Sequence, residues 1–129
     1  MLNDVDLIDA EGEALNAYHE AELDPERPPA LSVLCASLFG DKPRAVHRLP
    51  REAMMGIFCG QTRIWYRAGA WNEHVRFLCA HEMAHGRRKQ FHSIDLGAGS
   101  ARAEERADLL AACLIAPRPA FQRMVKRLG

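Results

Sequence analysis

The segment His81-Glu82-Met83-Ala84-His85 determines how the rest of this chain is interpreted. In a helix, two histidines four residues apart project from one face about one turn from each other, so both imidazoles can bind the same cation. Glu82 follows the first histidine, and a carboxylate there can reach a metal-bound water without itself binding the metal. Zinc hydrolases place their ligands and their general base in this way. The segment therefore predicts a metal site on a helix.

The flanking residues favour this helix. Asn72 is a good N-cap, and apolar residues follow it at helical spacing on one face, namely Val75, Leu78, Cys79 and Met83. The two histidines fall on a different face, so packing in the core does not explain them. The basic cluster Arg87-Arg88-Lys89 complements the carbonyl end of the helix dipole, or else contacts an acidic partner segment. Because the motif has only three fixed positions and also arises by chance, a helix without metal is the alternative.

Length and composition indicate a single globular domain. The 129 residues suffice for one modest core, and we expect one domain over 1–129, with an N-terminal helix and linker over 1–27 and the core over 28–129. Seventeen basic and seventeen acidic residues cancel to a formal charge of zero, so no global field favours nucleic acid or an anionic membrane. Hydrophobic residues make up 48% and charged residues 26%, which is typical of a folded protein.

Two further features indicate a cytoplasmic protein. No apolar run approaches the roughly 20 residues that cross a bilayer, and the start of the chain, residues 1–6, is acidic where a secretory signal would be basic. The four cysteines lie far apart in apolar runs, without a Cys-x-x-Cys pair: Cys35, Cys59, Cys79 and Cys113. We expect all four to be small buried hydrophobic residues of a reduced protein.

The remaining elements follow from apolar periodicity and from the positions of glycine and proline. A helix is predicted over 4–23, a stiff proline-rich connector over 24–29, and a short buried helix over 30–39 that stops at Gly40. Strands are predicted over 45–49, 54–59 and 62–66, the last two joined as a hairpin at Gly60-Gln61, in a small antiparallel sheet. A loop over 90–100, a long helix over 100–116 and an amphipathic helix over 121–128 follow, and we expect the last to close over the core.

A catalytic zinc ion held by two histidines needs a third protein ligand and an open position for water. Glu104 is the best candidate, because it lies 19 residues past His85, which leaves room for one loop and an antiparallel return. The small Ala107 would let the two helices approach closely, and Asp108, one turn after Glu104, could accept the free ring N–H of a histidine ligand. Glu105 is a rival ligand, and an acidic first turn that complements the helix dipole is the alternative for all three carboxylates.

Two blocks of sequence together resemble the ImmA/IrrE-type metallopeptidases of bacteria and their mobile elements. They are residues 77–86, FLCAHEMAHG, and residues 104–117, EERADLLAACLIAP. The second block is similar to the family's Glu-x-x-Ala-Asn helix, which ends in apolar residues and a proline. The resemblance covers roughly residues 28–128. Ala84, Asp108 and Ala116 stand where the family often has glycine, asparagine and methionine, and these departures leave the ligands and the base in place.

The resemblance implies an α+β, minimal zincin-like metallopeptidase fold, in which a small, mostly antiparallel three-stranded sheet packs on the His-Glu-x-x-His helix and on a second ligand-bearing helix. It implies Zn²⁺ as the cofactor, bound by His81, His85 and Glu104, with Glu82 as general base and Asp108 behind one histidine. It also implies cleavage of a helix-turn-helix repressor, in a stress response or a mobile element, without direct contact to nucleic acid. An exposed sheet edge could bind the substrate as an added strand.

Two alternative functions remain open. One is a non-catalytic, zinc-stabilised regulatory or antitoxin-like interaction module, and the other is a zinc hydrolase that acts on a small peptide or amide. Peptide hydrolysis also needs a hydrogen-bond donor for the tetrahedral oxyanion. Tyr66, His74 and His92 are candidates for this donor by residue type, and the sequence places none of them.

Overall fold

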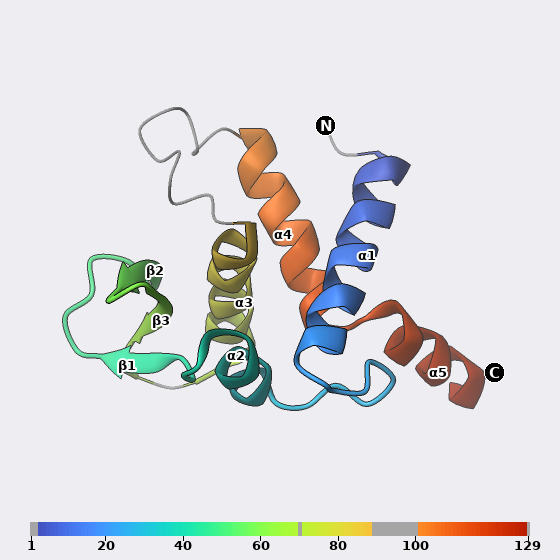
Figure 1. The fold of residues 1–129 in the computed structure, drawn as a ribbon, viewed down its shortest axis with the longest axis horizontal. Helices are drawn as coiled ribbons and strands as arrows, with labels where there is room; N and C mark the ends of the chain where they lie inside the picture. The colour runs from blue at the N-terminus through green and yellow to red at the C-terminus, as the bar shows by residue number, and fades with distance from the viewer. Residues whose placement is uncertain (1–2, 70, 89–100, 129) are drawn as a thin grey trace.

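The computed structural model describes residues 3–69, 71–88 and 101–128. Over these residues the chain is α+β, with five helices and one mixed sheet of three strands. In chain order the elements are α1 (Asp4–Glu20), α2 (Leu31–Phe39), β1 (Arg44–Val46), β2 (Ala53–Phe58), β3 (Gln61–Arg67), α3 (Glu73–Arg88), α4 (Ala101–Ile115) and α5 (Arg118–Leu128). Figure 1 shows α3 between the sheet and α4, with α1 and α5 on the side away from the sheet. The loop predicted over 90–100 lies outside the described residues.

The sheet has the strand order β1-β3-β2 and combines both kinds of pairing. β2 and β3 form the predicted antiparallel hairpin, but it turns at Cys59 and Gly60 instead of Gly60-Gln61. Both turn residues have positive φ angles, 52° and 77°, as a two-residue type I′ turn requires. β1 pairs with β3 in parallel, so the prediction of antiparallel pairing is wrong for this strand.

The path of the chain between β1 and β2 explains the parallel pairing. Val46, the last residue of β1, pairs with Arg67, and Ala53, the first residue of β2, pairs with Tyr66. Both pairs lie at the same end of β3, so residues 47–52 only have to cross that end before the hairpin begins. The crossing takes up the second half of the predicted first strand, and β1 is therefore shorter than expected.

α3 is the central element of the core. One side of it packs against β2 and β3 and another side against α4, which in turn packs against α1. The largest fully buried side chains come from α1, α2, β3, α3, α4 and the residue Pro117 that follows α4: Tyr18, Leu34, Cys35, Ile64, Cys79, Met83, Leu110, Leu114 and Pro117. Alanines lie at the helix contacts and permit close approach of the backbones. α2 ends at Gly40 as predicted, in the left-handed conformation with φ 85°.

α1 belongs to this core. Three alanines recur along its inner face, and none of them is more than 1% exposed: Ala10, Ala14 and Ala17. The buried Tyr18 hydroxyl donates a hydrogen bond of 2.7 Å to the carbonyl of Leu114 near the end of α4. At the other end of α1, Asn3 and Asp6 form a capping box. The unit expected over residues 28–129 therefore packs around a helix that precedes it in the sequence.

α5 contradicts one prediction. The expected amphipathic helix is present, but none of its residues is buried. Its larger apolar side chains, Phe121, Met124, Val125 and Leu128, are 60, 58, 50 and 81% exposed. The helix does not close over the core because α4 ends at Ile115 and the chain leaves the packed region after the buried Pro117. Figure 1 shows α5 running away from the other elements. Neither α5 nor any other described helix is long and apolar enough to cross a membrane.

The cysteines are free thiols, and three of them are buried as predicted. Burial raises the pKa of the Cys35 and Cys79 thiols to about 12, and it also raises the pKa of Cys113. The prediction is wrong for Cys59, which is exposed. Cys59 occupies the turn of the hairpin, which extends beyond the part of the sheet that packs on α3.

Candidate metal centre

Two features of α3 position His81 and His85. The Oδ1 of Asn72 accepts a hydrogen bond of 2.9 Å from the backbone three residues later, which confirms the predicted N-cap. Cys79 and Met83 are 0% exposed, so the core sets the rotation of the helix about its axis. The two histidines therefore share the face that α3 turns towards α4. Their ring centroids are 4.7 Å apart and their Nε2 atoms are 3.1 Å apart.

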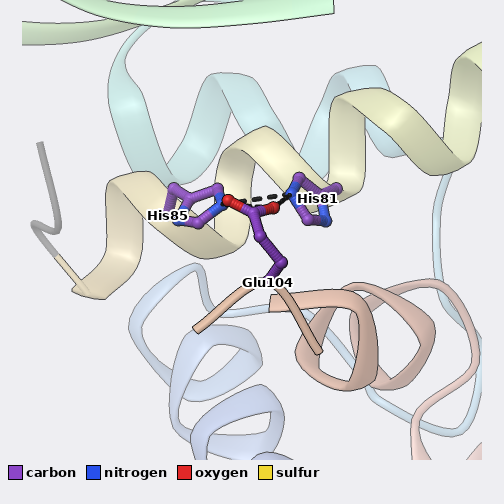
Figure 2. A group of neighbouring side chains, drawn as sticks. All are labelled: His81, His85 and Glu104. Atoms are coloured by element: carbon purple, nitrogen blue, oxygen red, sulfur yellow. Dashed lines mark hydrogen bonds and ion pairs between the residues drawn. The ribbon is translucent and has the colours of Figure 1, made fainter. Parts of the chain in front are cut away.

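α4 brings Glu104 to the two histidines. The helices pack closely where the small Ala107 is fully buried. The Oε2 of Glu104 lies 2.7 Å from Nε2 of His81, and its Oε1 lies 3.4 Å from Nε2 of His85 (Figure 2). One candidate ligand atom from each residue lies within 4.8 Å of the others, so this group could hold a metal ion. The structure thus brings together the three ligands that the sequence predicted.

The chemistry of these atoms matches a cation site. Two ligand atoms about 2.1 Å from one tetrahedral zinc ion lie about 3.4 Å apart. The separations of 3.1 Å between the two Nε2 atoms and 3.4 Å between His85 and Glu104 are close to this value, whereas the 2.7 Å between His81 and Glu104 is a hydrogen-bond distance. Two ring nitrogens and a carboxylate that face each other also need positive charge among them, which a proton or a metal ion supplies. Imidazole and carboxylate ligands suit transition metals, and the Glu104 side chain is 46% exposed, which leaves the cluster open on one side.

Asp108 contacts the other side of the His81 ring. It lies one turn after Glu104 on α4, and its Oδ1 is 2.7 Å from Nδ1 of His81. When the Nδ1–H donates to this carboxylate, Nε2 of the neutral ring keeps its lone pair and directs it into the cluster. Carboxylates in this position fix the tautomer and orientation of metal-binding histidines. The structure therefore gives Asp108 the contact that the sequence predicted.

Glu82 is half-buried next to the cluster. Burial raises the pKa of its carboxyl group above the usual value. The nearby His85, His81 and Arg51 side chains oppose this rise, and Glu104 adds to it. A carboxylate with a raised pKa is a better proton acceptor near neutral pH. Glu82 is therefore the candidate proton carrier of this site.

The structure also places the rival third ligand and two of the three candidate donors for the oxyanion. In the described part of the chain, the group of ligand atoms contains Glu104 and not its rival Glu105. His74 lies two turns before the first histidine on α3, about 10 Å along the helix axis, and its Nε2 is 3.3 Å from a glutamate carboxylate of the segment before β2. Tyr66 packs edge-on against a tryptophan ring, with centroids 5.0 Å apart. His92 lies outside the described residues.

The sequence predictions missed that α1 forms ion pairs with both helices that carry the candidate metal ligands. Three ion pairs cross from α1 to the ends of α3 and α4: Glu20–Arg87, Glu13–Arg88 and Asp6–Arg102. Arg87 and Arg88 of the predicted basic cluster therefore contact an acidic helix of their own chain, and Lys89 lies outside the described residues. The sequence contained a signal for this packing, because alanines at positions 10, 14 and 17 form a face of small residues on one side of a helix.

No protein-family model matches this chain, and no curated protein or solved structure was found to be similar to it. The cluster on α3 and α4, together with the sequence pattern around it, is therefore the basis on which a function can be proposed. Its parts are two histidines, a carboxylate from a second helix, a carboxylate behind one histidine and a half-buried glutamate next to them.

Proposed function

We propose that this chain is a zinc-dependent metallopeptidase. The observation that carries the proposal is the convergence of His81, His85 and Glu104 from two helices, with ligand atoms within 4.8 Å of one another. The His-Glu-x-x-His spacing and the contact between Asp108 and the first histidine support the same proposal. A zinc ion bound there would supply Lewis-acid chemistry, which acidifies water and polarises a peptide carbonyl.

In this proposal Glu82 is the general base. Its carboxylate takes a proton from the attacking water and later gives it to the amine of the departing peptide. The water adds across the C–N bond of the peptide, one fragment gains the hydroxyl and the other gains the proton, and no covalent enzyme intermediate is formed.

We further propose that the substrate is a helix-turn-helix repressor, whose cleavage relieves repression. The resemblance of residues 77–86 and 104–117 to the ImmA/IrrE-type metallopeptidases supports this substrate. β2 forms one edge of the sheet and packs on α3, so an extended substrate segment could pair with it next to the cluster. A formal net charge of zero suits a protein that acts on the repressor and not on DNA, and the protein would then act in the cytoplasm.

Elemental analysis tests the metal site. We expect about one zinc ion per chain in the wild type, and loss of zinc in His85→Ala and Glu104→Ala, because each substitution removes one of three ligands. Glu105→Ala is the matched control, since it removes the adjacent carboxylate from the same helix and should leave the zinc content unchanged. Circular dichroism checks that the variants are folded. Zinc retained in Glu104→Ala would contradict the assignment of the third ligand.

Incubation with the helix-turn-helix repressor encoded nearest to the gene tests catalysis. The wild type should cut this repressor, and the nearly isosteric Glu82→Gln should bind zinc but cut at least about 100-fold more slowly, because it cannot accept a proton. A repressor that is captured but never cut, with Glu82→Gln as active as wild type in repression assays, would identify a non-catalytic zinc-stabilised module. Hydrolysis of a small peptide or amide without cleavage of the repressor would identify a different zinc hydrolase.

A further inference from the structure

The sheet has one face that the proposed peptidase does not use. Successive side chains of a strand point to opposite faces of a sheet. Ile64 is 2% exposed and the methyl group of Thr62 lies against Gly86 of α3, so these positions of β3 face the helices. The opposite face carries five large side chains, none of them buried: Arg44, Phe58, Arg63, Trp65 and Arg67. We call the surface formed by these five residues the outer sheet face, and Figure 1 shows the helices on the other side of the sheet.

Arginines surround Trp65 on the outer sheet face. Arg44 of β1 is its direct neighbour on the adjacent strand. Arg63 and Arg67 lie two residues before and after it on β3, each about 7 Å away along the strand. The indole leans over Gly56 of β2, because a Cβ atom at this glycine would lie 2.9 Å from Cζ3 of the ring. An aromatic ring therefore lies on the central strand with a cation on three sides.

The three arginines are not neutralised by the sheet itself. β1, β2 and β3 contain no acidic residue. Arg63 and Arg67 donate hydrogen bonds of 3.2 and 3.1 Å to backbone carbonyls, which are neutral acceptors. Arg44 forms an ion pair of 2.9 Å with Asp41, and its side chain is still 56% exposed. The outer sheet face therefore keeps a net positive charge for a ligand.

The formal charge of zero is the sum of two regions of opposite sign. Residues 3–26 contain nine acidic residues and neither lysine nor arginine, whereas residues 42–67 contain six basic residues and one acidic residue. Figure 1 shows α3 and α4 between the sheet and the acidic α1. Charges more than about 10 Å apart are largely screened at 0.1 M salt. A ligand at the sheet therefore meets the local basic region, although the chain as a whole is neutral.

From this arrangement we propose that the outer sheet face binds a single strand of nucleic acid. Arginines bind phosphates, and exposed aromatic rings stack on unpaired bases. Phe58 is 66% exposed and pairs with a residue four positions before Trp65, so the two rings lie about 13 Å apart along the sheet, with Arg63 between them. Aromatic and cationic groups thus alternate, as bases and phosphates do along a polynucleotide.

Other polyanions match the outer sheet face less well. The bases of a duplex are already stacked on each other, so a duplex would leave the two aromatic rings without partners. An anionic membrane takes up a continuous apolar surface, whereas Arg63 separates the two rings here. The outer sheet face also points away from α3, which carries the candidate metal ligands His81 and His85, so a bound strand would leave that cluster open.

Fluorescence anisotropy with a labelled oligodeoxythymidylate of about 12 nucleotides tests the binding of the full chain. The logarithm of the association constant should fall with the logarithm of the salt concentration with a slope of about −2, since each of three arginine–phosphate contacts contributes about −0.7. Arg67→Gln should reduce this slope by about 0.7. Arg127→Gln, which removes an exposed arginine from α5, is the matched control and should keep the wild-type slope.

Two measurements test base stacking. Phe58→Ser should raise the dissociation constant of the oligonucleotide at least about fivefold, because one base loses its aromatic partner. Phe121→Ser is the matched control, since Phe121 is 60% exposed on α5, outside the outer sheet face. In Trp71→Phe, Trp65 is the one remaining tryptophan, and the oligonucleotide should quench its fluorescence. All these variants should keep the wild-type circular dichroism and zinc content.

Four outcomes would overturn the proposal: no binding at about 50 mM salt, equal affinity for a duplex of the same length, an unchanged dissociation constant in Phe58→Ser, or an unchanged Trp65 fluorescence. A protein that sediments with phosphatidylserine vesicles and does not bind the oligonucleotide would overturn it in favour of a membrane surface. None of these results depends on zinc or on cleavage of a repressor, so the proposal can fail while the proposed peptidase stands.

Discussion

α1 and α5 are both amphipathic, but only α1 is part of the core. Ala10 and Ala14 of α1 are at most 1% exposed, whereas α5 has no buried residue. From the sequence alone, α5 would be the better candidate for burial, because large apolar residues and charged residues separate more cleanly around α5 than around α1. Alanine contributes little apolar surface but lets helix backbones approach closely. Burial therefore follows from how a face fits its neighbours, and apolar periodicity alone does not determine it.

The two helices also differ in their polar contacts. α1 forms ion pairs with both helices that carry the candidate metal ligands, and its tyrosine hydroxyl bonds to the end of α4. The ion pair that the structure describes for α5 joins it to α1 alone. We therefore expect substitutions in α1 to disturb the whole domain and substitutions in α5 to leave its stability unchanged.

The largest difference should come from a charge placed on the inner face of α1. Ala14→Glu buries a carboxylate without a partner, and we expect it to lower the free energy of unfolding by about 4 kcal/mol. This is a large share of the roughly 5–15 kcal/mol of a typical domain. Val125→Glu places the same group on α5, where the side chain is 50% exposed, and should change the free energy of unfolding by about 0.5 kcal/mol or less. Urea unfolding followed by circular dichroism, at a concentration where the chain is monomeric, measures both. Equal losses would mean that α5 packs on the core in solution.

A smaller effect is expected from Tyr18→Phe. The substitution keeps the buried ring but removes the hydroxyl that donates 2.7 Å to the carbonyl of Leu114. The free energy of unfolding should fall by about 1.5 kcal/mol, because the buried carbonyl loses its partner. Tyr66→Phe is the control, since its edge-on contact with the ring of Trp71 does not involve the hydroxyl. If both variants lose the same free energy of unfolding, the hydrogen bond between Tyr18 and Leu114 does not stabilise the fold.

The same tyrosine predicts a pH dependence. Burial raises the pKa of Tyr18 to about 12, whereas the pKa of a tyrosine in the unfolded chain is about 10. The folded chain keeps the phenol proton at pH values where the unfolded chain loses it, so the free energy of unfolding should decrease as pH rises from about 10 to 12. The raised pKa values of Cys35 and Cys79 act in the same direction. Urea unfolding at several pH values should show a shallower decrease for Tyr18→Phe than for wild type, and identical slopes would contradict the assignment.

The smallest effect should come from the link between α1 and α5. Glu11→Gln breaks the pair with Arg118, whose side chain is 59% exposed, so water already screens the attraction. We expect a loss of about 0.5 kcal/mol or less in the free energy of unfolding at low salt, and no loss at about 1 M salt. Asp6→Asn, at a carboxylate that is 6% exposed and also caps α1, should cost more. Urea unfolding at low and high salt compares the two variants, and an equal cost would mean that the Glu11–Arg118 and Asp6–Arg102 pairs stabilise the fold equally.

The candidate metal cluster is the part of the structure that the sequence predicts best, because the determinants of its two histidines are local. The spacing of His81 and His85 and the cap at Asn72 require only that one segment be helical. Glu104 depends on the return of the chain, and the sequence could place it because the 19-residue separation and the small Ala107 allow two antiparallel helices in contact.

The sequence did not predict features that depend on distant parts of the chain. β1 pairs in parallel with β3 because of the crossing over residues 47–52, which no residue pattern within β1 encodes. A shift of one residue in the hairpin turn exposes Cys59, which the apolar run before it suggested would be buried. The position of α5 depends on the direction that the chain takes after α4 ends at Ile115, and the apolar face of α5 contains no information about what covers it.

The exposure of Cys59 makes it a natural attachment point for a spectroscopic probe. The other three thiols are buried with raised pKa values, so a maleimide dye or a nitroxide should react at this one position in the unmodified chain. A nitroxide on the hairpin would lie next to the free edge of β2. Its rotational mobility would report whether a peptide docks along that edge, in a protein whose histidines and carboxylates are all intact.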